Sequence, residues 1–370
     1  MLTTTSETQY FIALTLLKNV GSITARKLIA HFGTAQMVFE ATTKELLKIP
    51  GVGHSFIREI KNALYLHEAL KIIQICQKQE VYIIIYSDDN YPHRLKSLYD
   101  APLVLYFLGS EIPNSNKTLA VVGTRMATDY GKKVVGQLVS ESKNTNANFI
   151  SGLAYGIDIC MHVNCIENQI TNYAILAGGF DHIYPFQHKK YIDRILQNGG
   201  LIAEHPPSIK PDARYFPMRN RIIAGLSDAL IVVEAAQRGG ALITADFANN
   251  YHKEVFAVPG NLDRPFSMGC NQLIANNKAI VYLGFEELMK QMNWSRENDL
   301  NFSKQIELDF SKFTQNESAI LAAIHQLGDL SIDELVWKTN LTSKEIALIC
   351  LSLECDGLIK AIPGNRYMLI

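Results

Sequence analysis

The stretch "RNRIIAGLSDALIVVEAAQRGGALITA", residues Arg219–Ala245, decides the fold of this chain. Its central run, ALIVVEAA at 229–236, is apolar at consecutive positions rather than at alternate ones. Strands with this pattern have both faces covered, as in a parallel sheet packed between helices. Gly239 and Gly240 follow the run, and a helix-length stretch comes after them. The segment therefore predicts one strand and one helix of an α/β sheet.

Six more strand candidates continue this organisation, and the segments between them are long enough for right-handed crossover helices. They are LAVVG (119–123), FISGL (149–153), YAILAGG (173–179), GLIAEH (200–205), EVFAVPG (254–260) and AIVYLG (279–284). Together they predict a doubly wound, mostly parallel sheet within residues 76–292.

The flanking regions have different patterns. Residues 1–75 are periodic in the manner of helices and contain two similar phrases, Leu17–Gly33 and Leu46–Ala63, which predict a helix-hairpin-helix domain. Residues 293–315 are polar and predict a linker. Residues 316–370 predict three helices and a hairpin, the order of a winged helix.

Composition narrows the class of protein. The 370 residues carry a formal net charge of −1, with 48% apolar and 19% charged residues, which excludes a uniformly basic nucleic-acid coat. The six cysteines form no CxxC pair, so neither a zinc site nor a disulfide framework is expected. No run approaches the roughly 18 apolar residues of a membrane span. We expect a cytoplasmic protein without metal or cofactor.

Ligands of open parallel sheets bind beyond the carboxyl ends of the strands, so the residues after each run are informative. Several of these segments contain glycines, whose amides can face a phosphate. The first run is followed by GTRMATDYG, which lacks the spacing of a dinucleotide fingerprint and places Arg125 in the turn. This sequence does not predict a dinucleotide cofactor, and an arginine at this position suits a bound phosphate better than it suits a tight backbone turn.

Arg219 and Arg221 fall near the expected start of a helix, where cations are disfavoured by the helix dipole. Two readings remain open for each arginine. Either it holds an anionic ligand, or it pairs with an acidic residue at a neighbouring strand end. The acidic candidates are Asp181, Glu204, Asp228 and Glu234. Asp158 and His162, four residues apart, are expected to be structural, and no catalytic constellation is found.

The ordered motifs resemble the bacterial DNA-processing protein A (DprA/Smf) family over roughly residues 88–284, and more loosely beyond. The motifs are YPHRLKSLYDAPLVLYFLG (91–109), VVGTR (121–125), SGLAYGID (151–158), GGFDHIYP (178–185), GLIAEHPP (200–207), FPMRNRIIAGLS (216–227), VVEAAQRGGALITA (232–245), VFAVPG (255–260) and SMGCNQLI (267–274).

The resemblance implies an extended Rossmann-like core that forms a homodimer, flanked by the helix-hairpin-helix (SAM-like) and winged-helix domains. It implies a non-enzymatic protein that binds single-stranded DNA, protects it after uptake in natural transformation and loads the RecA recombinase. The DNA-binding positions carried over are Gly123, Arg125, Ser151, Gly152, Gly156, Asp158, Arg219, Asn220, Arg221, Arg238 and Thr244. Tyr155, Phe180, Tyr184 and Phe216 lie beside these motifs and either stack bases or pack in the core.

Two alternatives remain. The core also resembles phosphoribohydrolases that use a PGGxGTxxE loop, but the corresponding QRGGALITADFA has Asp246 and no glutamate. The other alternative is an interaction scaffold for the recombinase with secondary DNA binding. From Asn316 onward, the chain contains four basic and seven acidic residues, which gives a net charge of −3. Phosphates are repelled by such a surface, so we expect the winged helix to bind protein rather than duplex DNA.

Overall fold

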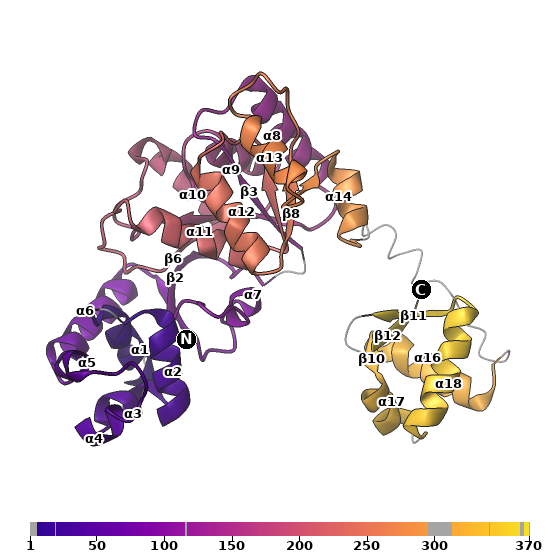
Figure 1. Ribbon diagram of the computed structural model, residues 1–370, viewed down its shortest axis with the longest axis horizontal. Helices are drawn as coiled ribbons and strands as arrows, with labels where there is room; N and C mark the ends of the chain where they lie inside the picture. Colours follow the sequence, from indigo (N-terminus) through magenta and orange to yellow (C-terminus); the bar gives the residue numbers. More distant parts are fainter. Residues whose placement is uncertain are drawn as a thin grey trace. The chain divides into compact units, whose positions relative to one another are not determined.

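A computed structural model describes residues 6–18, 20–114, 117–294, 313–339, 341–362 and 366–369. The chain divides into two compact units, residues 1–294 and 295–370. Figure 1 shows the first unit in indigo to orange and the second in yellow. The segment 295–312, most of the predicted linker, lies outside the described residues.

The first unit begins with six helices. They are α1 (Ser6–Leu16), α2 (Ser22–Phe32), α3 (Ala35–Glu40), α4 (Thr43–Leu46), α5 (His54–Ile60) and α6 (Leu64–Lys78). In the second predicted hairpin phrase, α4 and α5 are joined by a turn in which Gly51 has a φ of 89°, a conformation that favours glycine. Thr42 and Glu45 form a capping box at the start of α4, which satisfies the backbone N–H groups of these two residues.

The sheet has nine strands. They are β1 (Tyr82–Ile85), β2 (Val104–Gly109), β3 (Thr118–Val122), β4 (Asn148–Ser151), β5 (Asn172–Leu176), β6 (Gly199–Ala203), β7 (Ala229–Val232), β8 (Glu254–Ala257) and β9 (Ile280–Val281). Their order is β1-β2-β6-β5-β4-β3-β7-β8-β9. From β6 to β9 neighbouring strands are parallel, whereas β1 and β2 pair antiparallel and β2 is antiparallel to β6. The predicted mostly parallel, doubly wound sheet is confirmed, and β1 and β2 extend it beyond the seven predicted strands.

Helices cover both faces of this sheet. They are α7 (His93–Lys96), α8 (Asp129–Glu141), α9 (Ile157–Glu167), the 3-10 helix η1 (Phe186–Tyr191), α10 (Ile192–Gln197), α11 (Tyr215–Leu226), α12 (Gly240–Asn250), α13 (Met268–Ala275) and α14 (Phe285–Gln291). On β3, Ala120 and Val122 pack in a core with α11 and α12, while Leu119 and Val121 pack in a second core with α8 and α9. Burial on both faces is the physical reason for the consecutive apolar runs.

The helical region and the sheet share a third core. Side chains of α1 to α6 pack there with Ile85, Val104 and Tyr106 of β1 and β2. Two cations of the predicted hairpins serve this packing. Arg26 donates to the carbonyl oxygens of Leu98 (2.6 Å) and Tyr99 (3.2 Å), and Lys61 donates to those of Phe39 (3.1 Å) and Ala41 (2.6 Å).

The second unit contains α16 (Gln315–Leu327), β10 (Leu330–Ser331), α17 (Ile332–Thr339), α18 (Ser343–Cys355), β11 (Ile359–Ile362) and β12 (Arg366–Leu369). The strands form an antiparallel sheet in the order β10-β12-β11. Nine buried side chains, among them Ile320, Leu335 and Ile346, form a core of its own. The predicted winged helix is confirmed, and the tip of its hairpin (363–365) lies outside the described residues.

Candidate functional site

The strand order reverses direction at β3. The chain passes from β3 to β4 on one side and reaches β7 and β8 on the other, so β3 and β7 form the switch point of the sheet. A cavity of about 400 Å³ lies beyond their carboxyl ends. We call it the strand-end cavity. Its lining residues are Val122, Gly123, Thr124, Arg125, Met126, Ala154, Asp158, Phe216, Pro217, Arg219, Asn220, Ile223, Ala235, Ala236, Arg238, Gly239, Gly240, Ala241, Ile243, Thr244 and Phe266.

Arg219 is the buried cation of this cavity. It lies in the second turn of α11 and is only 6% exposed. Its guanidinium donates to the carbonyl oxygens of Gly152 (2.6 Å) and Ile175. Burial lowers the pKa of Arg219 to about 10, so the side chain still carries its charge at neutral pH.

Asp158 is the acidic group that opposes this charge. Its carboxylate accepts the backbone N–H of Gly152 (3.1 Å) and of Ala154 (3.4 Å). Burial raises the pKa of Asp158, while the neighbouring Arg219 acts in the opposite direction. The carboxylate therefore fixes the loop after β4 and offsets part of the positive potential of Arg219.

Arg125 and Arg238 are exposed and line the same cavity. The Arg125 guanidinium lies 5.6 Å from the ring centre of Phe216, and the Arg219 guanidinium lies 5.9 Å from the same ring centre. The charge of Arg125 also lowers the pKa of Arg219, because the two cations repel each other. Among the residues that the structure describes, neither Arg125 nor Arg238 has an acidic partner within ion-pair distance. The cavity therefore combines three guanidinium groups with one buried carboxylate.

Glycines allow this close packing. At Gly152 a Cβ would lie 2.5 Å from the Arg219 guanidinium. Gly156 has a φ of 78°, and a Cβ there would overlap the backbone of Thr124 and Arg125. Neither residue lines the cavity itself, so both shape it from behind.

Seven of the eleven residues predicted for the site line the cavity: Gly123, Arg125, Asp158, Arg219, Asn220, Arg238 and Thr244. Asn220 donates to the carbonyl oxygen of Gly240 (3.4 Å), and Thr244 donates to the same oxygen (3.2 Å). The Asn220 bond connects α11 to the start of α12, whereas the Thr244 bond lies within the first turn of α12.

Ser151 and Arg221 lie elsewhere. The Ser151 hydroxyl is buried and donates to the Val121 carbonyl oxygen (2.6 Å), which ties β4 to β3. Arg221 is 4% exposed, forms an ion pair with Glu204 and donates to the Asp100 carbonyl oxygen (2.5 Å). Of the two readings that the sequence left open for Arg221, the geometry supports the ion pair. Burial raises the pKa of Glu204, and Arg221 opposes that shift.

The neighbouring aromatic residues differ in exposure. Tyr184 is 48% exposed and meets Phe216 edge-on, with ring centres 5.6 Å apart. Tyr155 is 39% exposed, and its hydroxyl donates to Gln187 (2.8 Å). Phe180 instead packs against the buried clusters of α10 and the N-terminal helices.

Sequence reasoning missed several contributors. Met126, Ile243 and Phe266 line the cavity, and Phe186 beside Tyr184 is 74% exposed. Phe266 directly precedes the motif that begins at Ser267, in the loop after β8. The signal in the sequence is the position of Phe266 in a loop that follows a strand, since ligands of open parallel sheets bind beyond the carboxyl ends of the strands.

The geometry gives less support to hydrolysis of the phosphoribohydrolase type, to an Asp158–His162 pair and to a metal site. Asp246, which stands near the position of a phosphoribohydrolase glutamate, is exposed and pairs with Lys278 (3.0 Å). His162 and Asp158 have separate partners, since His162 Nδ1 lies 2.8 Å from Asn172 Oδ1. Within the described part of the chain, no group of three or more His, Cys, Asp or Glu side chains is placed to hold a metal ion. The described helices also include none long and apolar enough to span a membrane.

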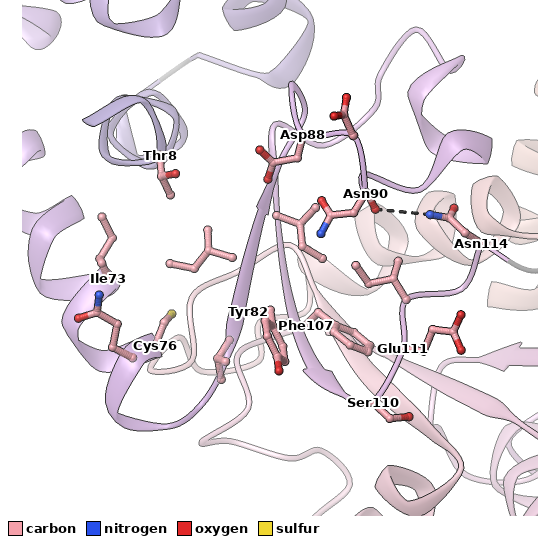
Figure 2. A pocket seen from close by; sticks show the side chains of 16 residues that line it. Thr8, Ile73, Cys76, Tyr82, Asp88, Asn90, Phe107, Ser110, Glu111 and Asn114 are labelled. Carbon is pink, nitrogen blue, oxygen red and sulfur yellow. Dashed lines mark hydrogen bonds between the residues drawn. The ribbon is translucent and has the colours of Figure 1, made fainter. Parts of the chain in front are cut away.

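A separate cavity of about 670 Å³ lies between the N-terminal helices and the edge of the sheet. Figure 2 shows Thr8, Ile73 and Cys76 on one side of it and Asp88, Asn90 and Glu111 on the other. The charged side chains that line it are Asp88, Asp89 and Glu111, all acidic. An anionic ligand would be repelled there, so the strand-end cavity is the better candidate for phosphate.

Comparison with known proteins identifies the family of the chain. The model of the family described as DNA recombination-mediator protein A matches residues 82–293, and that of the DprA winged helix domain matches residues 313–365. The chain is 29% identical to "Protein Smf" of Synechocystis over 98% of both chains. It is 39% identical to "DNA processing protein DprA" of Bacillus subtilis, covering 59% of this chain and 75% of that one.

Two solved structures are similar. The DprA structure from Streptococcus pneumoniae superimposes with a TM-score of 0.64 at 29% identity, covering 77% of this chain and 97% of the other. The DprA from Helicobacter pylori, whose structure is described as showing a single-stranded DNA binding mode, gives a TM-score of 0.52 at 27% identity, covering 58% and 95%. Because the family model covers more than half of its length and the solved structures share its fold, the chain belongs to the DNA recombination-mediator protein A (DprA) family.

Proposed function

We propose that the chain binds single-stranded DNA at the strand-end cavity. The observation that carries the proposal is the pair of exposed guanidiniums, Arg125 and Arg238, that have no acidic partner among the described residues. Arg125 and buried Arg219 repel each other, and a phosphate between the arginines would relieve that repulsion. The binding mode described for the H. pylori relative supports the choice of a single strand.

Binding of this kind reads the backbone and not the sequence. Arginine forks contact phosphates, while exposed aromatic faces stack unpaired bases of any type. Tyr184 and Phe216 offer such faces next to Arg125. A duplex keeps its bases stacked inside, so these aromatic contacts are lost and we expect weaker binding of double-stranded DNA.

The predicted residues then divide by role. Arg125, Arg238 and Asn220 contact the strand, Gly123 and Thr244 form the wall, and Arg219 supplies positive potential from below, balanced by Asp158. Ser151, Gly152 and Gly156 shape the cavity without contact. Arg221 braces α11 against Glu204.

A titration tests this proposal. In fluorescence anisotropy with a labelled poly-dT oligonucleotide, Arg125→Gln and Arg238→Gln are each expected to weaken binding by about tenfold. Each is also expected to reduce the slope of log K against log salt by about 0.7, the value for one phosphate contact on a single strand.

Arg214→Gln is the matched control. Arg214 is an exposed arginine directly before α11, and it is already paired with Asp212. Its affinity is expected to equal that of the wild type. Undiminished binding by the Arg125→Gln/Arg238→Gln double variant would refute the proposed site, and absence of binding by the wild type would refute the function.

We further propose that the protein acts as a cytoplasmic, non-enzymatic homodimer that protects incoming DNA and loads RecA during natural transformation. The family relationship supports this, and the acidic winged helix fits a protein partner better than DNA. RecA filament formation on single-stranded DNA, with the wild type and the Arg125→Gln/Arg238→Gln variant, separates two cases. If loading persists after DNA affinity is lost, the chain acts on the recombinase as a scaffold.

A further inference from the structure

Another cavity adjoins the strand-end cavity. It has a volume of about 760 Å³ and lies at the carboxyl ends of β7 and β8, against the start of α8. We call it the loop cavity, since residues 259–267, the loop after β8, form most of its wall. Phe266 lines both cavities, so a chain leaving the strand-end cavity across this ring enters the loop cavity.

The loop cavity contains an unused hydroxyl. Ser267 is 8% exposed and lines the cavity, and among the described residues its Oγ has no hydrogen-bond partner. Although Ser267 is the residue before α13, its side chain does not cap that helix. A Cβ at position 260 would overlap this hydroxyl, so Gly260 keeps the space beside it open. The Ser267 hydroxyl lines a cavity large enough for a ligand, and its oxygen is accessible from that cavity rather than enclosed in the core.

The wall around Ser267 is rigid. The Asn271 side chain accepts the N–H of Gly260 (3.1 Å) and donates to its carbonyl oxygen (2.8 Å). The Phe266 carbonyl oxygen accepts the N–H of Ala235 (2.7 Å), which anchors the loop to the end of β7. A site held in this way is formed before its ligand arrives.

The charges of the cavity favour one orientation of a nucleotide. Arg264 is exposed and, among the described residues, has no acidic partner for its guanidinium. Glu234 is the acidic lining residue, and its two oxygens accept the Thr128 N–H (2.9 Å) and hydroxyl (2.6 Å). A phosphate is therefore attracted to Arg264 and kept from Glu234.

The remaining lining is suited to a base. Tyr130, Pro259, Pro265 and Phe266 supply flat or apolar surfaces, and the Tyr130 hydroxyl is fixed by donation to the Pro259 carbonyl oxygen (2.8 Å). Bases stack on such surfaces without regard to sequence.

We propose that the loop cavity holds the next nucleotide of the single strand, with its phosphate on Arg264 and the Ser267 hydroxyl and its base against Phe266 and Pro265. This inference rests on the proposed function and extends its binding path from the β3–β7 switch point to the end of β8.

The test uses the full-length protein and poly-dT oligonucleotides of increasing length. The shortest oligonucleotides that the wild type binds fill only the strand-end cavity. Arg264→Gln and Ser267→Ala are therefore expected to bind them with the same affinity as the wild type. On longer oligonucleotides, Arg264→Gln is expected to bind about tenfold more weakly than the wild type. Its slope of log K against log salt is expected to be smaller by about 0.7.

Two controls accompany these variants. Leu262→Ala changes an 88% exposed side chain of the same loop that does not line the cavity, and Lys290→Gln removes a charge on α14. Both are expected to follow the wild type at every length, and thermal unfolding confirms that all variants are folded.

Three outcomes decide the matter. Wild-type length dependence and salt slope in Arg264→Gln would overturn the loop cavity while leaving the proposed function intact. Equal loss at every length would also overturn it, because Arg264 would then act in the strand-end cavity. If Arg264→Gln shows the expected length-dependent loss while Arg125→Gln and Arg238→Gln bind like the wild type, the strand-end site is wrong and the loop cavity stands.

Discussion

At the scale of single residues, Gly152 illustrates how the site depends on packing. The carbonyl oxygen of Gly152 accepts from Arg219, its N–H donates to Asp158, and its Cα faces the guanidinium. Arg219 can hold its charge this close to the sheet because residue 152 has no side chain. A motif glycine of this kind acts on a ligand only through its neighbours.

The substitution Gly152→Ala is therefore expected to be costly. Its Cβ would lie 2.5 Å from Arg219, and such overpacking typically costs about 1–3 kcal/mol. Urea unfolding is expected to show this loss, and anisotropy a reduced affinity for single strands as Arg219 is displaced. Gly239→Ala is the control for stability, since nothing lies within 4 Å of its Cβ and its φ of −169° suits any residue. Equal stability of the two variants would contradict this account of Gly152.

His162 gives the fold a dependence on pH. It is fully buried, and burial lowers its pKa to about 4, with the charges of His188 and Arg219 acting in the same direction. The unfolded chain, whose histidines have pKa values near 6.5, binds more protons between these two values. Stability is therefore complete above about pH 6.5 and is lost as the pH falls towards 4.

The variant His162→Gln does not titrate in this range, although it is expected to be less stable at neutral pH. Between pH 7 and pH 4.5, the wild type is expected to lose about 2.4 kcal/mol more unfolding free energy than the variant. Urea titrations at the two pH values measure this difference. Parallel losses in both proteins would show that His162 is not the group responsible.

At the scale of elements, helix ends are specified locally. Thr342 and Glu345 form a capping box at the start of α18, with the Glu345 N–H donating to Thr342 Oγ1 (3.3 Å) and the Thr342 N–H donating to Glu345 (2.9 Å). The same arrangement begins α4 and α16. These signals are readable from sequence because the partners lie three residues apart.

Thr342→Ala is expected to destabilise the second unit by about 1 kcal/mol. Hydrogen exchange of the α18 amides in the full-length chain measures this as faster local opening. Ser352→Ala, an exposed position inside the same helix, is expected to leave exchange unchanged or slower, because alanine favours helices. Faster exchange in both variants would show that the cap is not the cause.

The strands show where element prediction reached its limit. Seven were expected from apolar runs, and all seven are present as β3 to β9. The strands β1 and β2 were not identified, although Tyr82–Ile85 reads YIII. Both lie at the antiparallel end of the sheet, outside the alternation of strand and crossover helix that guided the prediction.

At the scale of the whole molecule, the two units have separate cores. The first contains the strand-end cavity and the loop cavity, and the second has its own buried cluster and a net charge of −3 from residue 316 onward. We therefore expect a chain that ends at Trp294 to bind single-stranded DNA within about twofold of the full-length affinity, because the removed part repels phosphates. A tenfold loss in the same anisotropy assay would assign a DNA contact to the winged helix.

The sequence by itself determined the seven parallel strands, the winged helix and the family, because consecutive apolar runs and ordered motifs are local properties of the chain. It also determined which residue types gather at the strand ends. Tertiary structure alone decided which arginines face the cavity. Two positions apart on a helix, the side chains of Arg219 and Arg221 point in directions about 160° apart. Only the packing of α11 against the sheet places Arg219 beneath the cavity and Arg221 against Glu204.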